Sequence, residues 1–203
     1  MLEVNSIVNS SIEQFCKDFI DNPYLCYTEH GIHAYFYNIL FQNLAPEQRY
    51  IDIGSHKVCV LQKEYPTNHN LDKSKRQNWD IAVINAKQLN FPSYDHLELD
   101  SVIEFGLNEP LEHLQDDLNR ILHSKANVTN KFLVHLHRLS GFGNDRISRR
   151  DWSQKSKRIV MLEEIINICK DTDSVIYYAM FDSSELFQNG VWKIAENRVE
   201  KLK

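Results

Sequence analysis

The pattern of apolar and polar residues predicts two helices followed by three strands in the first half of the chain. Apolar residues recur at helical spacing in the first two segments, and a proline follows each of them. The period then changes to two, and short apolar runs bounded by polar loops are typical of strands. The helices are expected over 7–21 and 28–44, and the strands over 58–65, 80–84 and 101–107.

The second half of the chain alternates between predicted helices and strands. An amphipathic helix is expected over 108–122, with Asn108 as its N-terminal cap. The elements expected after it are a strand, a helix and a strand, over 131–139, 154–169 and 175–181. The polar tail at 190–203 fits a strand or a helix equally well. This order of elements predicts an α/β fold with a central mixed sheet flanked by helices.

Composition fits one soluble domain across residues 1–203, with 1–26 as an N-terminal helical extension and 190–203 as a tail. Apolar residues make up 42% of the chain and charged residues 25%, which are ordinary values for a globular protein. No apolar run approaches the ~20 residues that span a bilayer, so no membrane association is expected. The four cysteines lie far apart without a CxxC pair, and no signal-peptide pattern is present, which favours the reducing cytoplasm.

Two carboxylates interrupt predicted strands in the middle of the chain. Asp80 opens the strand over 80–84, and Glu104 lies inside the strand over 101–107. Acidic residues are depleted in strands and costly to bury without a partner. Two arrangements explain them. Each acid can belong to a structural ion pair, or both can bind a divalent metal, for which carboxylate oxygens are suitable ligands.

Positive charge is concentrated in one segment of an otherwise acidic chain. The net charge of −5 argues against a uniformly basic nucleic-acid-binding surface. Residues 145–158 nevertheless contain six cations and only two acids. Such a run is by default a solvated loop, but segregated charge also steers anionic partners. The six cations are Arg146, Arg149, Arg150, Lys155, Lys157 and Arg158.

The acids and their order along the chain resemble the PD-(D/E)XK nuclease superfamily, whose fold is restriction-endonuclease-like. The family pattern is an acid on the first helix, an Asp on the second strand and an E-x-K motif on the third. Here Glu29 begins the second predicted helix, Asp80 opens the second strand and Glu104 lies on the third. The resemblance covers Tyr27 to Leu139 and implies an α-β-β-β-α-β core. Trp79 stands where the family has the proline of its PD pair.

The resemblance implies a divalent-metal-dependent nuclease that hydrolyses phosphodiester bonds of DNA. Asp80 and Glu104 are then ligands of Mg²⁺ or Mn²⁺, and Glu29 joins them in the catalytic set. The carbonyl of Phe105 and the carboxylate of Glu64 complete the metal ligands. The metal lowers the pKa of a bound water and offsets charge on the phosphate. Trp152 is expected to stack on a base. The residues expected to contact nucleic acid are Lys73, Lys75, Arg76, Arg146, Arg149, Arg150 and Trp152. A homodimer is left open.

The family's lysine is missing, because Gly106 stands at its position two residues after Glu104. Residues two apart on a strand face the same side, and glycine can neither orient a water nor stabilise charge on a phosphate. Lys63, Lys73 and Lys75 lie near the acids in sequence but belong to no motif. The alternative is therefore a catalytically degenerate nuclease-like domain that binds nucleic acid or protein. An unrelated α/β fold is the third hypothesis.

Histidines occur in two closely spaced pairs, His30 with His33 and His135 with His137. Zinc-binding histidines can have such spacing, but no HExxH motif or Cys/His framework surrounds either pair. Surface histidines, or histidines with satisfied hydrogen bonds, are the favoured interpretation for both pairs.

Overall fold

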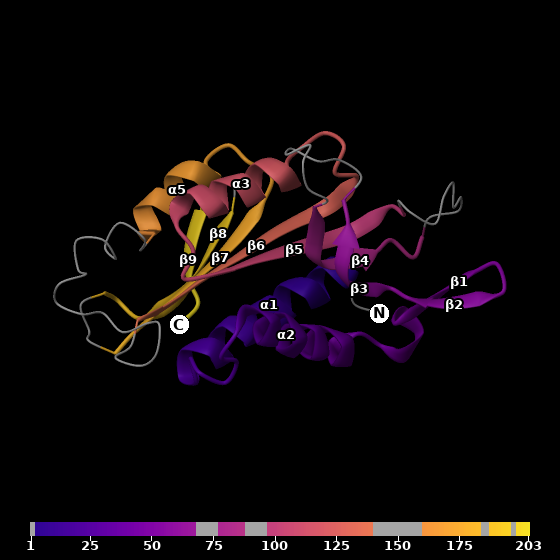
Figure 1. Cartoon of the computed structure of the whole chain (residues 1–203), viewed down its shortest axis with the longest axis horizontal. Coiled ribbons are helices and arrows are strands. Elements are labelled where there is room, and N and C mark those ends of the chain that lie inside the picture. The colour runs from indigo at the N-terminus through magenta and orange to yellow at the C-terminus, as the bar shows by residue number, and fades with distance from the viewer. Residues whose placement is uncertain (1–2, 68–76, 88–96, 140–159, 184–186, 196–197) are drawn as a thin grey trace.

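The chain folds into three layers, with helices on both faces of a seven-stranded sheet (Figure 1). The computed structural model describes residues 3–67, 77–87, 97–139, 160–183, 187–195 and 198–203. The helices are α1 (Val4–Asp21), α2 (Glu29–Asn43), α3 (Leu111–Ile121) and α5 (Leu162–Cys169), with a short 3-10 turn at Pro46–Gln48. α1 and α2 cover one face of the sheet, and α3 and α5 cover the other. The predicted mixed sheet flanked by helices is therefore confirmed. None of the described helices is both long and apolar enough to cross a membrane.

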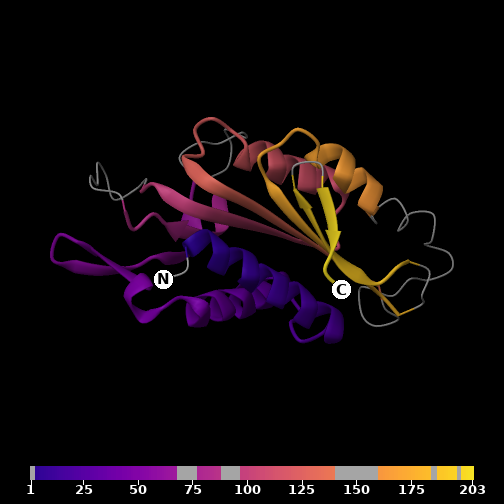
Figure 2. The ribbon, with the colours of Figure 1, turned by 180° about the vertical axis from the view of Figure 1, so that it is seen from behind.

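A sheet of mixed direction forms the middle layer. Its strands are β3 (Leu61–Pro66), β4 (Asn78–Ile84), β5 (Leu99–Leu107), β6 (Val128–Leu139), β7 (Val175–Asp182), β8 (Gly190–Ala195) and β9 (Arg198–Lys201), in that spatial order. β3, β4 and β5 form an antiparallel meander, and β6 and β7 continue parallel to β5. β8 and β9 return antiparallel, and β9 is the yellow strand at the edge of the sheet in Figure 2. The polar tail is therefore made of strands.

The strand predicted over 58–65 is two strands in different sheets. β2 (His56–Cys59) pairs with β1 (Tyr50–Ile53) in a separate hairpin, which projects from one end of the molecule in Figure 1. Val60 connects the two sheets, because its N–H bonds the segment before β1 and its carbonyl accepts a hydrogen bond from the end of β4. A period-two pattern alone does not reveal such a switch of partner.

The N-terminus of α3 differs from the predicted arrangement. Pro110, rather than Asn108, is the capping residue of α3. Asn108 has a φ of 58°, in the left-handed region that asparagine tolerates better than most residues. Its Oδ1 atom accepts a hydrogen bond of 2.8 Å from the backbone N–H of Arg138. The expected cap is therefore wrong, and Asn108 instead fixes the end of β5 to β6.

The helix predicted over 154–169 begins later than expected, because Val160 and Met161 are not helical and α5 starts at Leu162. Residues 154–159 lie outside the described residues.

Aromatic side chains hold β5 against the helices α1 and α2. The ring centroid of Phe105 lies 5.7 Å from that of Phe15 on α1 and 5.2 Å from that of Phe36 on α2. All three rings are buried, and full burial of such a side chain contributes roughly 1.5–3 kcal/mol. Because side chains alternate along a strand, Glu104 points away from this aromatic cluster and toward α3.

Candidate metal centre

β4 and β5 diverge where Asp80 and Glu104 would lie opposite each other. The last pair of the ladder is Ile81 with Ile103, so the next would join Asp80 to Glu104. At this point the Oδ2 atom of Asp80 accepts a hydrogen bond of 2.8 Å from the backbone N–H of Phe105. A side-chain carboxylate thus takes the place of a backbone partner, and the strands part beside it.

Glu104 is buried next to a cation from α3. Its side chain is 3% exposed, and its Oε2 atom lies 2.8 Å from Nη2 of Arg120. The same nitrogen lies 2.8 Å from Oδ1 of Asp117, and the guanidinium lies 5.6 Å from the ring centroid of Trp79. The other oxygen of Glu104, Oε1, has no hydrogen-bond partner among the described residues. Since burying such an acceptor costs about 1–3 kcal/mol, this oxygen is suited to bind a proton or a metal ion.

Burial raises the pKa of Glu104 well above its usual value, and the charge of Asp80 raises it further. Asp80 also lies within hydrogen-bonding reach of the Glu104 carboxyl group, whereas Arg120 opposes the shift. Two carboxyl groups this close cannot both be ionised without a compensating charge. Arg120 supplies such a charge to Glu104, and a cation bound between the two carboxyl groups would offset their repulsion further.

Helix α2 brings two further groups to Asp80. Nε2 of His33 lies 3.6 Å from Oδ2 of Asp80, whose side chain is 20% exposed. Glu29 is the first residue of α2, and its position is fixed by Thr28, whose hydroxyl accepts a backbone hydrogen bond in the first turn. Burial first, and then the charge of Asp80, raise the pKa of Glu29 to about 7. Asp80 thus lies beside Glu104 and is electrostatically coupled to Glu29.

The remaining predicted ligands, Glu64 and Phe105, both lie next to Asp80. Glu64 falls between two paired positions of β3 and β4, which places it opposite Asp80. It is exposed and has a φ of 54°. Phe105 offers its N–H to Asp80. A ligand role for the Phe105 carbonyl stays a prediction.

His135 fills the space beside Gly106, the position at which the nuclease superfamily that the sequence resembles has a lysine. Gly106 pairs with His135 across β5 and β6, and a Cβ atom on Gly106 would lie 3.1 Å from Nδ1 of His135. His135 is buried, and burial lowers its pKa well below the usual value, so the ring is neutral. A larger side chain at position 106 would have to displace it. Arg120 on α3 supplies the positive charge near Glu104 instead.

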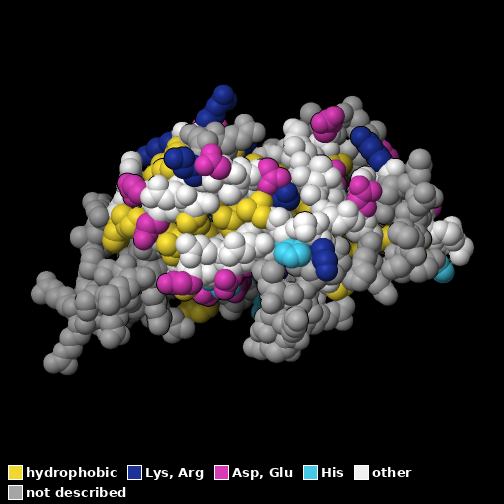
Figure 3. Space-filling view, turned by 90° about the horizontal axis from the view of Figure 1, so that it is seen from above, with side chains coloured by type: hydrophobic (Ala, Val, Ile, Leu, Met, Phe, Trp, Pro, Cys, Tyr) yellow, Lys and Arg dark blue, Asp and Glu magenta, His cyan; other side chains and the backbone are white. Residues whose placement is uncertain are grey.

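All of the cations predicted to contact nucleic acid lie in parts of the chain that the structure does not describe. On the face shown in Figure 3, described Lys and Arg side chains are interspersed with Asp and Glu. Lys63 is exposed on β3. The predicted contacts outside the described residues are Lys73, Lys75, Arg76, Arg146, Arg149, Arg150 and Trp152.

Arg120, Asp117 and His113 form a polar network on α3 that hydrophobic periodicity does not single out. Oδ2 of Asp117 lies 3.1 Å from Nδ1 of His113, and this hydrogen bond raises the pKa of His113 to about 9. Asp117 is buried at helical spacing from the buried Leu114 and Ile121. An acid inside an otherwise apolar stripe is the signal that could have identified this network.

The two histidine pairs behave differently. His135 and His137 are buried, their Nε2 atoms lie 3.2 Å apart, and the N–H of Val160 donates to Nε2 of His137 at 3.0 Å. The expectation of satisfied rings is met only in part for this pair, because Nδ1 of His137 is buried without a hydrogen-bond partner among the described residues. His33 is buried as well, but neither of its ring nitrogens has a hydrogen-bond partner among the described residues. For His33 the expectation of a surface or satisfied ring is wrong.

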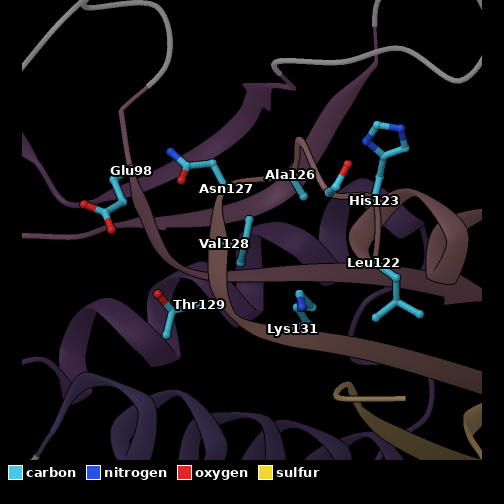
Figure 4. Close-up of a pocket in the computed structure, with 9 residues that line it drawn as sticks. Glu98, Leu122, His123, Ala126, Asn127, Val128, Thr129 and Lys131 are labelled. Carbon is cyan, nitrogen blue, oxygen red and sulfur yellow. The ribbon is translucent and has the colours of Figure 1, made fainter. Parts of the chain in front are cut away.

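An open pocket lies at the start of β6, away from these residues (Figure 4). Glu98, His123, Asn127 and Lys131 are among the side chains that line it. None of the candidate metal ligands belongs to this lining.

Comparisons with protein-family models, with curated proteins and with solved structures found no match for this chain.

Proposed function

We propose that the chain is a divalent-metal-dependent nuclease with a restriction-endonuclease-like core, which hydrolyses phosphodiester bonds of DNA. The order of elements supports this fold. An α-β-β-β-α-β core requires a helix, three strands, a helix and a strand in that order. The chain supplies this order as α2, the meander of β3, β4 and β5, then α3 and β6. β6 is parallel to β5, and α2 and α3 lie on opposite faces of the sheet.

The observation that carries the proposal is the meeting of Asp80 and Glu104 where β4 and β5 part. Glu104 is buried with one oxygen lacking a donor among the described residues, and Asp80 lies within hydrogen-bonding reach of it. Glu29 adds a third carboxyl group that is electrostatically coupled to Asp80. Hard divalent cations bind such oxygens at about 2.0–2.6 Å. The donor set therefore fits Mg²⁺ or Mn²⁺, whose charge would offset the repulsion between the acids.

The side chains around the acids have separate tasks under this proposal. The N–H of Phe105 orients Asp80, and Arg120 orients Glu104. Glu29, with a pKa of about 7, is suited to accept a proton from an attacking water at neutral pH. A Mg²⁺ or Mn²⁺ ion bound by Asp80 and Glu104 would lower the pKa of water and offset charge on the scissile phosphate.

A second function is favoured by two observations. Glu104 already has a cationic partner in Arg120, and Gly106 lacks the family's lysine. Both fit a degenerate nuclease-like domain that binds nucleic acid without cutting it. The acids would then be the structural ion pairs that explain buried carboxylates equally well.

A cleavage assay on the full chain tests the proposal. Supercoiled plasmid, linear duplex DNA, single-stranded DNA and RNA would each be incubated with protein in Mg²⁺, in Mn²⁺ or in a chelator. We expect metal-dependent cleavage of DNA that Asp80→Asn and Glu104→Gln abolish. Glu29→Gln should slow it by roughly 10²–10⁴-fold, as loss of a general base does.

The matched controls are Glu112→Gln and Asp116→Asn, since both acids are exposed on α3. They should cleave at the wild-type rate. Cleavage that persists in Asp80→Asn and Glu104→Gln would refute the assignment of these residues. Binding of DNA without cleavage in any metal would favour the degenerate domain.

A further inference from the structure

A second group of metal-ligating side chains lies beside Asp80, on α2 and β3. His30, His33 and Glu64 each present one ligand atom, and these atoms all lie within 4.8 Å of one another. Nε2 of His33 lies 3.6 Å from Oδ2 of Asp80. The group therefore adjoins the candidate metal centre but does not include Glu104.

The local structure explains why these three side chains meet. His30 and His33 are three residues apart on α2 and so lie on one face of the helix. Their ring centroids are 6.2 Å apart and their planes are nearly perpendicular, at 89°. Glu64 comes from the neighbouring strand β3, where its φ of 54° is uncommon for a residue with a side chain.

The buried imidazole of His33 is the independent sign of a ligand. Its side chain is only 4% exposed, yet neither Nδ1 nor Nε2 has a hydrogen-bond partner among the described residues. Buried polar atoms are nearly always satisfied in folded proteins. A neutral imidazole nitrogen is a common metal ligand, so a bound cation would satisfy this ring.

We propose that His30, His33 and Glu64 bind a divalent transition-metal ion of the Zn²⁺ and Co²⁺ class. Two histidine nitrogens and one carboxylate form a known three-ligand zinc set that leaves a fourth position open. Bonds of about 2.0–2.2 Å place tetrahedral ligand atoms about 3.4 Å apart. His30 and Glu64 are both exposed, so their side chains can close the remaining distance and the ion has a path of entry.

This site differs in chemistry from the pair of Asp80 and Glu104. Imidazole nitrogens favour zinc, cobalt and copper, whereas carboxylate oxygens alone favour magnesium and manganese. The nitrogen-containing site does not depend on the proposed nuclease function, because neither of its histidines belongs to the carboxylate pair and Glu104 is not one of its ligands. Glu64 is the one residue that is a predicted ligand at both sites. The two sites can therefore be tested separately.

Titration with Co²⁺ tests the nitrogen-containing site directly. The full chain, first treated with a chelator, would be titrated with Co²⁺ while the visible absorption of the bound ion is recorded. We expect a saturable spectrum that Zn²⁺ removes and Mg²⁺ does not. His30→Ala and Glu64→Gln should weaken Co²⁺ binding at least about tenfold. His30 and Glu64 are preferred to His33 for substitution because they are exposed, and circular dichroism would verify that both variants fold.

The controls are His56→Ala and Glu47→Gln, which remove an exposed histidine and an exposed acid elsewhere. Both should bind Co²⁺ like the wild type, and so should Glu104→Gln. Wild-type protein that gives no Co²⁺ spectrum, or folded His30→Ala and Glu64→Gln variants with unchanged affinity, would overturn the proposal. Loss of cleavage in Glu104→Gln with Co²⁺ binding retained would show that the two sites are distinct.

Discussion

Removing the cation next to Glu104 should destabilise the protein strongly. In Arg120→Met, the carboxylates of Glu104 and Asp117 both lose a guanidinium nitrogen at 2.8 Å. The side chain of Arg120 is 15% exposed and that of Glu104 is 3% exposed, so water screens the pair weakly. Breaking a buried pair from one side costs about 3–5 kcal/mol. For a chain of this size we expect the unfolding midpoint to fall by roughly 6–20 °C.

Thermal and urea unfolding, followed by circular dichroism in the presence of a chelator, would measure this loss. Adding Mn²⁺ should reverse part of it, because a cation on Glu104 and Asp80 replaces the missing charge. Saturation at 100 times the dissociation constant would contribute about 2.7 kcal/mol. The double variant Arg120→Met with Glu104→Gln should be more stable than Arg120→Met alone, since it leaves one fewer buried charge.

The matched control is Lys131→Met, which breaks an ion pair with Asp173, a residue whose side chain is 67% exposed. Exposed pairs contribute about 0–1 kcal/mol, so this variant should be nearly as stable as the wild type. A loss below about 1 kcal/mol in Arg120→Met as well would refute the reasoning. Glu104 would then not depend on a neighbouring cation.

Three further predictions concern the same region. The free energy of unfolding of Glu29→Gln, relative to that of the wild type, should increase as the pH is raised from about 5 to about 8. Proton binding by Glu29, whose pKa is about 7 in the folded protein, stabilises the fold at low pH and is lost as the pH rises through that value. Urea unfolding at several pH values measures the difference, and a difference that does not change with pH would contradict the shift. Gly106→Ala should lower the free energy of unfolding in urea by about 1–3 kcal/mol, because the added Cβ would lie 3.1 Å from Nδ1 of His135. An unchanged unfolding midpoint would mean that the His135 ring moves aside at no cost in stability. Arg138→Met should reduce both stability and Mn²⁺ affinity, because its guanidinium donates to three backbone carbonyls in the segment before α2, which positions Glu29. Calorimetric titration with Mn²⁺ measures the affinity, and an unchanged value in folded protein would separate that segment from the site.

Hydrophobic periodicity was sufficient to place the elements that carry the candidate site. The apolar runs around Asp80 and Glu104 are strands, and the amphipathic stripe after them is α3. An acid in an apolar run stands out in a sequence because burial makes it costly. Asp80 and Glu104 could therefore be selected from the pattern alone, whereas Glu29 was selected only through the resemblance to the nuclease superfamily.

The partners of these acids could not be predicted, because they depend on tertiary contacts. Arg120 reaches Glu104 only because α3 crosses back over β5, and a helical pattern does not specify which strand lies beneath each turn. His135 lies beside Gly106 because of the register between two parallel strands. No hairpin turn joins these two strands, so turn geometry could not be used to predict which residue of β6 lies beside Gly106.

The unsatisfied ring of His33 was missed for a similar reason. Its spacing from His30 was visible, but its burial depends on how α2 packs against Phe105, whose ring centroid lies 5.1 Å from that of His33. Glu64 joins them through a left-handed backbone conformation at a non-glycine residue. Such a conformation has no reliable signature in a single sequence.

Diffraction from Mn²⁺-soaked crystals tests the central claim most directly. Data collected near the manganese absorption edge would locate the ion by its anomalous signal. If Asp80 and Glu104 bind a metal ion, we expect an anomalous-difference peak about 2.0–2.6 Å from carboxylate oxygens of both residues. Crystals with no peak there at saturating Mn²⁺, and with Arg120 still bound to Glu104, would contradict it.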